Sequence, residues 1–132
     1  MCGIFATINT QPVTPSLLSG LALLSYRGYD SAGIAVINQG GLVRQRAQGK
    51  LENLSLQLEQ EPVEGFIGIA HTRWATHGLP TERNAHPHMT LDVAVVHNGI
   101  VENCNALRAK LEGQGYVFES ETDSESIAHL IT

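Results

Sequence analysis

The hydrophobic residues of the chain follow two different spacings, and the switch between them predicts alternating strands and helices. Short apolar runs bounded by Gly, Pro or Asn are typical of buried strands, whereas leucines that recur every three or four positions are typical of helices. The predicted strands cover residues 2–9, 34–37, 42–48, 66–72, 91–97 and 116–119, and the predicted helices cover residues 17–24, 51–58, 106–111 and the segment from 122 onward. Because only Gln39-Gly40-Gly41 and Asn38 separate residues 34–37 from 42–48, these two strands are expected to form a β-hairpin.

The segment between the predicted strands 66–72 and 91–97 is long and polar. A loop of this length in a compact domain usually carries function, so we expect part of a site there. The last predicted helix runs to Thr132 without a capping glycine or a polar tail. We therefore expect the domain to be incomplete at its C-terminal end.

The amino-acid composition indicates which broad class of protein the chain belongs to. The chain has 132 residues, of which 42% are hydrophobic and 16% charged, and this predicts one soluble globular domain or a part of one. A formal charge of −5 with scattered Lys and Arg residues argues against a nucleic-acid partner. Since the cysteines are Cys2 and Cys104 alone, and the sequence shows neither a signal peptide nor a membrane span, we expect a cytoplasmic protein without a membrane partner.

Cys2 is the first candidate for catalysis, because it directly follows the initiator methionine. Removal of Met1 would leave a thiol and a primary amine on the same residue. The amine titrates near pH ~8 and the thiol near ~8.5, so the amine can take the thiol proton at neutral pH as the sulfur attacks. The alternative is that Cys2 simply packs in the core.

His97-Asn98-Gly99 is the second candidate, at the end of a predicted strand. One interpretation is a hairpin turn, since Asn-Gly is the commonest dipeptide of type I′ turns. The other is an oxyanion hole, in which the side-chain amide of Asn98 and the backbone N–H of Gly99 donate to a developing negative charge. These residues alone leave both interpretations open.

Arg73 and Asp123 are candidates for binding an amino acid. Arg73 ends a predicted strand and could hold a carboxylate through two hydrogen bonds, with a surface salt bridge as the alternative. Asp123 stands at a predicted helix start, where helix capping is the alternative to pairing with an ammonium group. In the functional interpretation the two side chains bind opposite ends of one zwitterion.

Six histidines raise the question of a metal, and His86-Pro87-His88 holds the nearest pair. No Cys-x-x-Cys motif and no helical pair with a glutamate accompanies them. We therefore expect no metal site.

Six motifs, in this order, resemble those of the glutaminase domain of the class II glutamine amidotransferases. Their residues are most similar to the motifs of the glutamine:fructose-6-phosphate amidotransferase family. The motifs are CGI at residues 2–4, YRGYDSAG at 26–33, GIAHTRWATHG at 68–78, NAHPH at 84–88, VHNGI at 96–100 and SETDSE at 120–125. They extend over nearly the whole chain, and their number and order make a chance match negligible.

The resemblance implies an α+β fold of the N-terminal nucleophile (Ntn) hydrolase class. This fold is an αββα sandwich, in which two β-sheets pack between helical layers, and the chain would form it incompletely at the C-terminal end. The resemblance also implies that Cys2 is the nucleophile and its free amine the base, with Asn98 and Gly99 as the oxyanion hole. Arg27 and Gly28 would lie beside Cys2 and help to orient it.

The remaining site residues follow from the same resemblance. Arg73 would bind the α-carboxylate of glutamine, and Asp123 would bind its α-amino group. The loop that closes over the substrate would contain Trp74, Thr76 and His77. His86 and His97 would be supporting residues near the site.

The implied reaction is hydrolysis of L-glutamine through a γ-glutamyl thioester on Cys2, without a metal or organic cofactor. In the complete enzyme, the ammonia would aminate fructose 6-phosphate to glucosamine 6-phosphate. Residues 1–132 would be a partial glutaminase domain without the family's sugar-phosphate isomerase domains, and the full-length enzyme would be a homo-oligomer. The alternatives are an inactive fragment and the glutaminase part of another class II amidotransferase.

Overall fold

The computed structural model describes residues 2–25, 29–74 and 78–132. Its strands are β1 (Gly3–Ile8), β2 (Ser31–Asn38), β3 (Gly41–Gln48), β4 (Ile67–Arg73), β5 (His88–Met89) and β6 (Ala94–Val95). Its helices are α1 (Thr14–Leu24), α2 (Leu51–Gln60), α3 (Cys104–Gly113) and α4 (Glu125–Ile131), with a short 3-10 helix, η2 (Glu82–Asn84). None of the described helices has the length and apolar character needed to cross a membrane.

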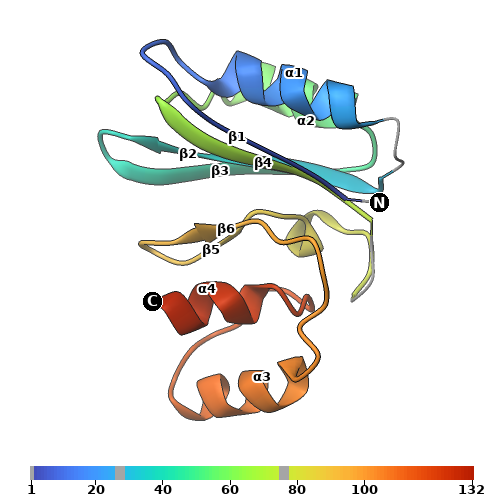
Figure 1. The fold of residues 1–132 in the computed structure, drawn as a ribbon, viewed down its shortest axis with the longest axis vertical. Coiled ribbons are helices and arrows are strands. Elements are labelled where there is room, and N and C mark those ends of the chain that lie inside the picture. The colour runs from blue at the N-terminus through green and yellow to red at the C-terminus, as the bar shows by residue number, and fades with distance from the viewer. Residues whose placement is uncertain (1, 26–28, 75–77) are drawn as a thin grey trace.

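These elements stack in layers, and α3 lies outside α4 (Figure 1). Helices α1 and α2 cover one face of an antiparallel sheet with the strand order β1-β4-β2-β3. The short antiparallel pair β5–β6 lies against the other face, and α4 and α3 lie beyond it. The order helix, sheet, sheet, helix agrees with the αββα architecture expected from the motifs.

The main core lies between the large sheet and the helices α1 and α2. Successive side chains of a strand point to opposite faces of a sheet, so Ile34 and Val36 of β2 point toward the helices. Leu17 and Leu21 are four positions apart on α1 and are fully buried against this face. Burial of a leucine side chain stabilises a fold by about 1.5–3 kcal/mol, so this layer fixes how the helices sit on the sheet.

The opposite face of the sheet allows a close approach of the loop that contains His86. Gly33 and His71 are paired across β2 and β4 on this face. A Cβ atom on Gly33 would lie only 2.0 Å from the backbone oxygen of His86. Glycine is therefore required there, because any side chain would push the loop away from the sheet.

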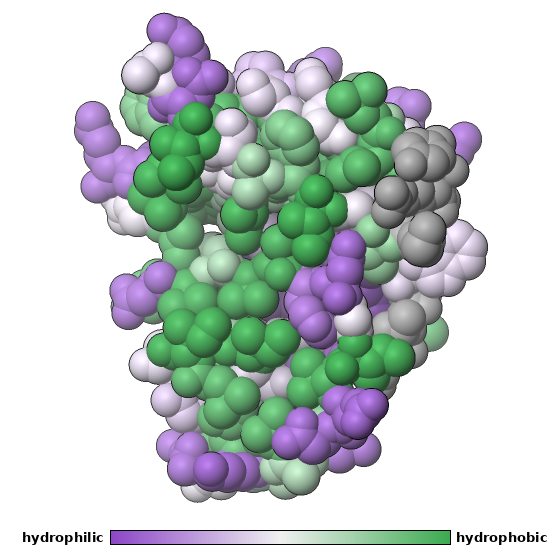
Figure 2. Space-filling view, in the orientation of Figure 1, coloured by the Kyte–Doolittle hydropathy of each residue, from purple (hydrophilic) through white to green (hydrophobic). Residues whose placement is uncertain are grey.

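An apolar cleft of about 280 Å³ lies between the two sheets, away from His86. Ala35 and Ile37 of β2 line it together with Ile67 and Ile69 of β4 and with Ala94 of β6. Figure 2 shows hydrophobic residues spread over the middle layers of the visible face. The two sheets thus meet through apolar side chains at this end and through polar ones at the other.

The structure corrects two of the predicted strands. Residues 91–97 contribute only the two-residue strand β6, because its partner β5 is equally short. Residues 116–119 form no strand: the backbone N–H of Glu119 donates to a carboxylate oxygen of Glu125, 2.7 Å away, instead of to a neighbouring strand. The other predicted strands and helices are present, with ends shifted by a few residues.

Candidate active site

Cys2 lies at the end of the large sheet, where its position follows from strand pairing. Gly3 pairs with Thr72 across β1 and β4, and this brings Cys2 beside the residues that follow β4. The backbone N–H of Trp74 donates to Cys2 Sγ at 3.1 Å, and the same sulfur lies 3.7 Å from the backbone oxygen of Trp74. The thiol is partly exposed, so a substrate can reach it.

Gly3 is required next to Cys2 for steric reasons. Its backbone N–H donates to Thr72 Oγ1 at 3.0 Å. A Cβ atom at this position would lie 2.9 Å from both Thr72 Oγ1 and Leu24 Cβ. The neighbour of Cys2 therefore packs tightly between β4 and α1, which fixes the backbone that carries the thiol.

Asn98 contacts Cys2 although the two residues are 96 positions apart in the sequence. Its side-chain Nδ2 donates to the backbone oxygen of Cys2 at 2.9 Å. The oxygen of the same amide, Oδ1, lies 2.9 Å from Nε2 of His71. Gly99 follows with a positive φ of 152° and does not connect two paired strands, so the hairpin-turn interpretation of Asn98-Gly99 is wrong.

Behind Asn98, a group of histidines connects the large sheet to the second layer. The rings of His71 and His86 stack with centroids 4.1 Å apart, and the ring of His88 meets that of His86 edge-on at 4.5 Å. The backbone N–H of His97 donates to His86 Nδ1 at 3.4 Å, and His97 Nδ1 lies 3.0 Å from Ser124 Oγ. The structure thus brings His86 and His97 together with Asn98.

Burial keeps the inner histidines neutral. Loss of hydration lowers the pKa of His71 to about 4, against smaller opposing effects of Asn98 and the backbone of His97. Burial, followed by the neighbouring positive charges, also lowers the pKa of His86 and of His88 well below the usual value. At neutral pH these rings carry no charge.

Arg73 and Asp123 are both buried near Cys2. Arg73 is 3% exposed, and its guanidinium donates to the backbone oxygen of Leu79 at 3.1 Å. Burial lowers its pKa, while Asp30, Cys2 and Asp123 act in the opposite direction, so these groups are close enough to interact electrostatically. The two oppositely charged side chains expected at the ends of an amino acid therefore lie in one region.

Asp123 also connects two segments of the site. Its Oδ2 accepts the backbone N–H of Val101 at 2.6 Å, which ties residue 123 to the segment after Gly99. Helix α4 begins two residues later, at Glu125, with Ser124 as its N-terminal cap residue. The carboxylate thus holds the chain next to Gly99, in addition to standing near the helix start.

The other predicted site residues are distributed as follows. Trp74 follows β4 and is 54% exposed beside Cys2. Arg27, Gly28, Thr76 and His77 lie outside the residues that the structure describes. Within the described ranges, no group of three or more His, Cys, Asp or Glu side chains is arranged to hold a metal ion.

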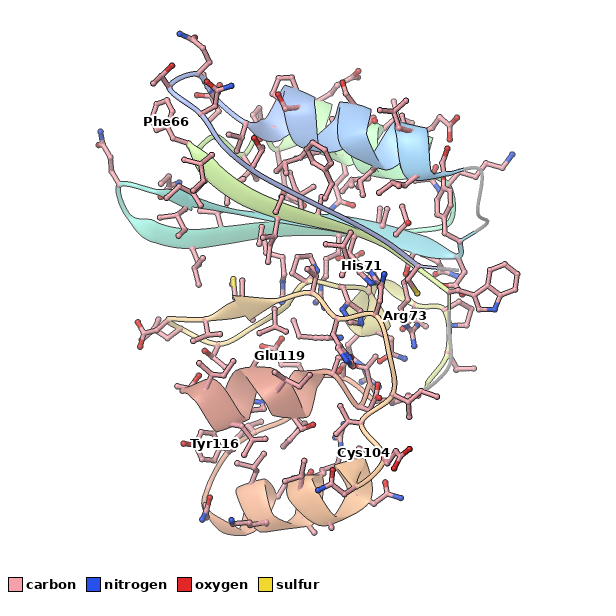
Figure 3. All side chains as sticks on the ribbon, in the orientation of Figure 1. Phe66, His71, Arg73, Cys104, Tyr116 and Glu119 are labelled. Carbon is pink, nitrogen blue, oxygen red and sulfur yellow. The ribbon has the colours of Figure 1, made fainter. Side chains whose placement is uncertain are left out.

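Sequence reasoning missed His71 as a site residue. Figure 3 shows His71 and Arg73 lying close together where β4 faces the second layer. The two are separated by one residue, and alternation along a strand places such residues on the same face. His71 could therefore have been identified from its position two residues before Arg73, which is predicted to bind the substrate.

Comparisons of the sequence with known proteins agree with this geometry. Residues 71–132 match the family model of a glutamine amidotransferase domain. The whole chain is 60% identical to a glutamine–fructose-6-phosphate aminotransferase (isomerizing) of Brucella suis biovar 1 (strain 1330) and 59% identical to one of Rhizobium meliloti (strain 1021). The chain spans 22% of the length of each of these relatives.

Two solved structures have a fold similar to that of the chain. An allosteric regulatory enzyme of purine biosynthesis matches 99% of the chain with a TM-score of 0.80, and the chain covers 29% of it. The glutamine phosphoribosylpyrophosphate amidotransferase of B. subtilis matches 98% of the chain with a TM-score of 0.73, and 28% of that enzyme is covered. Both are 30% identical in sequence. The chain therefore has the α+β Ntn fold of these amidotransferases, is similar over its whole length to part of the glutamine–fructose-6-phosphate aminotransferases, and matches a glutamine amidotransferase domain over residues 71–132.

Proposed function

We propose that this protein hydrolyses the side-chain amide of L-glutamine, with Cys2 as the nucleophile. The observation that carries the proposal is the 2.9 Å hydrogen bond from Asn98 Nδ2 to the backbone of Cys2. It holds a neutral N–H donor group next to the thiol, where an amide carbonyl under attack would develop its negative charge. An amide nitrogen has two hydrogens, so one remains for the substrate.

The first half of the reaction forms a thioester and releases ammonia. After removal of Met1, the α-amino group of Cys2 takes the thiol proton as the sulfur attacks the amide carbon of glutamine. The carbonyl electron pair moves onto oxygen, which accepts hydrogen bonds from Asn98 Nδ2 and the backbone N–H of Gly99. The C–N bond then breaks, and the leaving nitrogen takes the proton from the α-ammonium group and departs as ammonia.

The second half releases glutamate. Water attacks the γ-glutamyl thioester and gives a proton to the α-amino group, while the same two donors hold the oxyanion. The C–S bond breaks, and the sulfur recovers a proton from the α-ammonium group. No step requires a metal or an organic cofactor, because the nucleophile, base and oxyanion donors all come from the chain.

Recognition of glutamine rests on charge. Arg73 would bind the α-carboxylate and Asp123 the α-ammonium group, since both are buried near Cys2 and carry opposite charges. Trp74 would cover the substrate together with Thr76 and His77, and Arg27 with Gly28 would orient the backbone of Cys2. His86 and His97 would support Asn98 from behind.

The names of the 60% identical relatives suggest where the ammonia goes. In the whole protein we propose transfer to fructose 6-phosphate, by a sugar-phosphate isomerase domain beyond these 132 residues, in a cytoplasmic homo-oligomer. In this proposal residues 1–132 form only part of the glutaminase domain. Transfer to phosphoribosylpyrophosphate is the second candidate, but the solved structures that favour it are only 30% identical.

The test is the release of glutamate and ammonia from glutamine labelled with ¹⁵N in its side-chain amide. Replacement of Cys2 by alanine should reduce the rate by about a thousandfold or more, because no other group can form the thioester. Cys104→Ala is the matched control. Cys104 lies at the start of α3 (Figure 3), on a different element from Cys2, and this variant should keep the wild-type rate.

Two results would overturn the proposal. One is a Cys2→Ala protein that still releases labelled ammonia at the wild-type rate. The other is a folded wild-type protein, with Met1 removed, that releases none.

A further inference from the structure

We infer that His71 is a positioning residue that holds the Asn98 amide in the one orientation that offers Nδ2 to the substrate. This inference rests on the proposed glutaminase function, because it assigns the residue on which the oxyanion donor depends. The observation is a chain of two hydrogen bonds of 2.9 Å, from His71 Nε2 to Asn98 Oδ1 and from Asn98 Nδ2 to the backbone oxygen of Cys2.

The direction of these bonds follows from the chemistry of the last acceptor. A backbone carbonyl oxygen can only accept a hydrogen bond, so the Asn98 atom that faces Cys2 is the NH₂ group. The oxygen of the amide therefore faces His71. Because an amide oxygen also only accepts, His71 must carry its proton on Nε2 and donate it to Asn98.

The surroundings of His71 restrict the orientation of its ring. The side chain is fully buried on β4, and its ring is stacked on that of His86 with an angle of 18° between the planes. Among the described residues, Nδ1 of His71 has no partner within hydrogen-bond geometry, whereas Nε2 lies 2.9 Å from Asn98 Oδ1, and the backbone of His97 contributes a smaller effect on the pKa of His71 than Asn98. Its pKa of about 4 agrees with a neutral ring that has a single N–H throughout the neutral range.

Without His71, the amide of Asn98 loses the contact that distinguishes its two ends. An amide that turns over would present oxygen, not N–H, to the developing oxyanion and would oppose the reaction. Loss of one oxyanion donor costs about 10²–10³ in rate in comparable enzymes. The expected effect falls on kcat, because Arg73 and Asp123, which would bind the substrate, are left unchanged.

The test compares two variants of the purified protein that differ by one methylene. His71→Gln keeps an N–H donor near the position of Nε2, whereas the amide of His71→Asn is too short to reach Asn98. We expect kcat for glutamine hydrolysis to stay within about fivefold of wild type in the glutamine variant and to fall about a hundredfold in the asparagine variant. KM for glutamine should change by less than about threefold in both.

A second readout does not depend on activity. In ¹⁵N NMR spectra of the wild-type protein at pH 7, the imidazole of His71 should carry its proton on Nε2, with a protected N–H. A proton on Nδ1 would overturn the inference, and so would a folded His71→Asn protein with wild-type kcat. An inactive wild-type protein with Nε2 protonated would instead contradict the proposed function and leave the hydrogen-bond orientation established.

Discussion

Asn98 is the residue on which the geometry of the site depends, because both ends of its amide are engaged. Cys2 accepts from its nitrogen, and His71 lies at its oxygen. Cys2 precedes β1, His71 lies near the C-terminal end of β4, and Asn98 follows β6. The three residues are therefore brought together by the fold and not by their proximity in the sequence. For these residues, the fold determines which group donates and which accepts in the two hydrogen bonds of the Asn98 side chain.

The buried histidines make the stability of the protein depend on pH. His71 has a pKa of about 4 in the folded state and about 6.5 in an unfolded chain, so between these values only the unfolded state binds the proton. The stabilisation is complete above pH ~6.5 and is lost as the pH falls toward ~4. Each such histidine lowers the free energy of unfolding by about 1.4 kcal/mol per pH unit within this window. His86 and His88 act in the same direction.

We therefore expect urea denaturation to give a free energy of unfolding at least about 3 kcal/mol lower at pH 5 than at pH 7. The His71→Gln variant removes one titrating group and is the control. The free energy of unfolding of this variant should change less with pH, because unfolding of the variant takes up about one proton fewer. Equal stability of the wild-type protein at the two pH values would contradict the assignment of neutral, buried rings.

At the scale of elements, Glu125 at the start of α4 organises the segment that leads to the site. Its carboxylate is 4% exposed and accepts the backbone N–H groups of Glu119 and Ser120, each at 2.7 Å, as well as the hydroxyl of Ser120. These bonds shape the turn that carries Asp123. They also replace the strand pairing that was expected for residues 116–119.

Replacement of Glu125 by glutamine should lower the free energy of unfolding by about 2–4 kcal/mol, because an NH₂ group would then face a buried N–H donor. Glu121→Gln is the matched control. Glu121 is exposed and pairs with the exposed Arg83 at 3.1 Å, so its replacement should cost less than about 1 kcal/mol. The measurement is urea denaturation at pH 7, and equal losses in both variants would contradict the role of Glu125.

Much of the fold could be predicted from the sequence where hydrophobic spacing alone determines the element. The hairpin β2–β3 and the helices α1 and α2 are examples, since their apolar residues face one core. Residues 91–97 and 116–119 could not, because apolar runs do not reveal how short a partner strand is or that a carboxylate takes a backbone N–H. Cys2 and Asn98 were predicted from sequence motifs. For His71 the spacing to Arg73 indicates only the face of the strand, and its contact with Asn98 becomes visible only in the structure.

At the scale of the whole molecule, the stacked layers bring the N-terminal end of the chain close to the end of β4 (Figure 1). Pairing of β1 with β4 fixes Cys2 beside Trp74, and the second layer brings Asn98 to the same place. The chain has this arrangement although it spans only 22% of the length of its 60% identical relatives. We expect the assembled site to activate Cys2 toward glutamine.

Activation of Cys2 can be tested by measuring the intact mass of the protein before and after incubation with a glutamine analogue that carries an electrophilic diazoketone in place of the amide. We expect Met1 to be absent, one adduct to form in the wild-type and Cys104→Ala proteins, and none to form in Cys2→Ala. Excess glutamine should slow the labelling, because both compounds would bind through Arg73 and Asp123. A protein without Met1 that remains unlabelled, or a Cys2→Ala protein that is labelled equally well, would contradict the activation of Cys2.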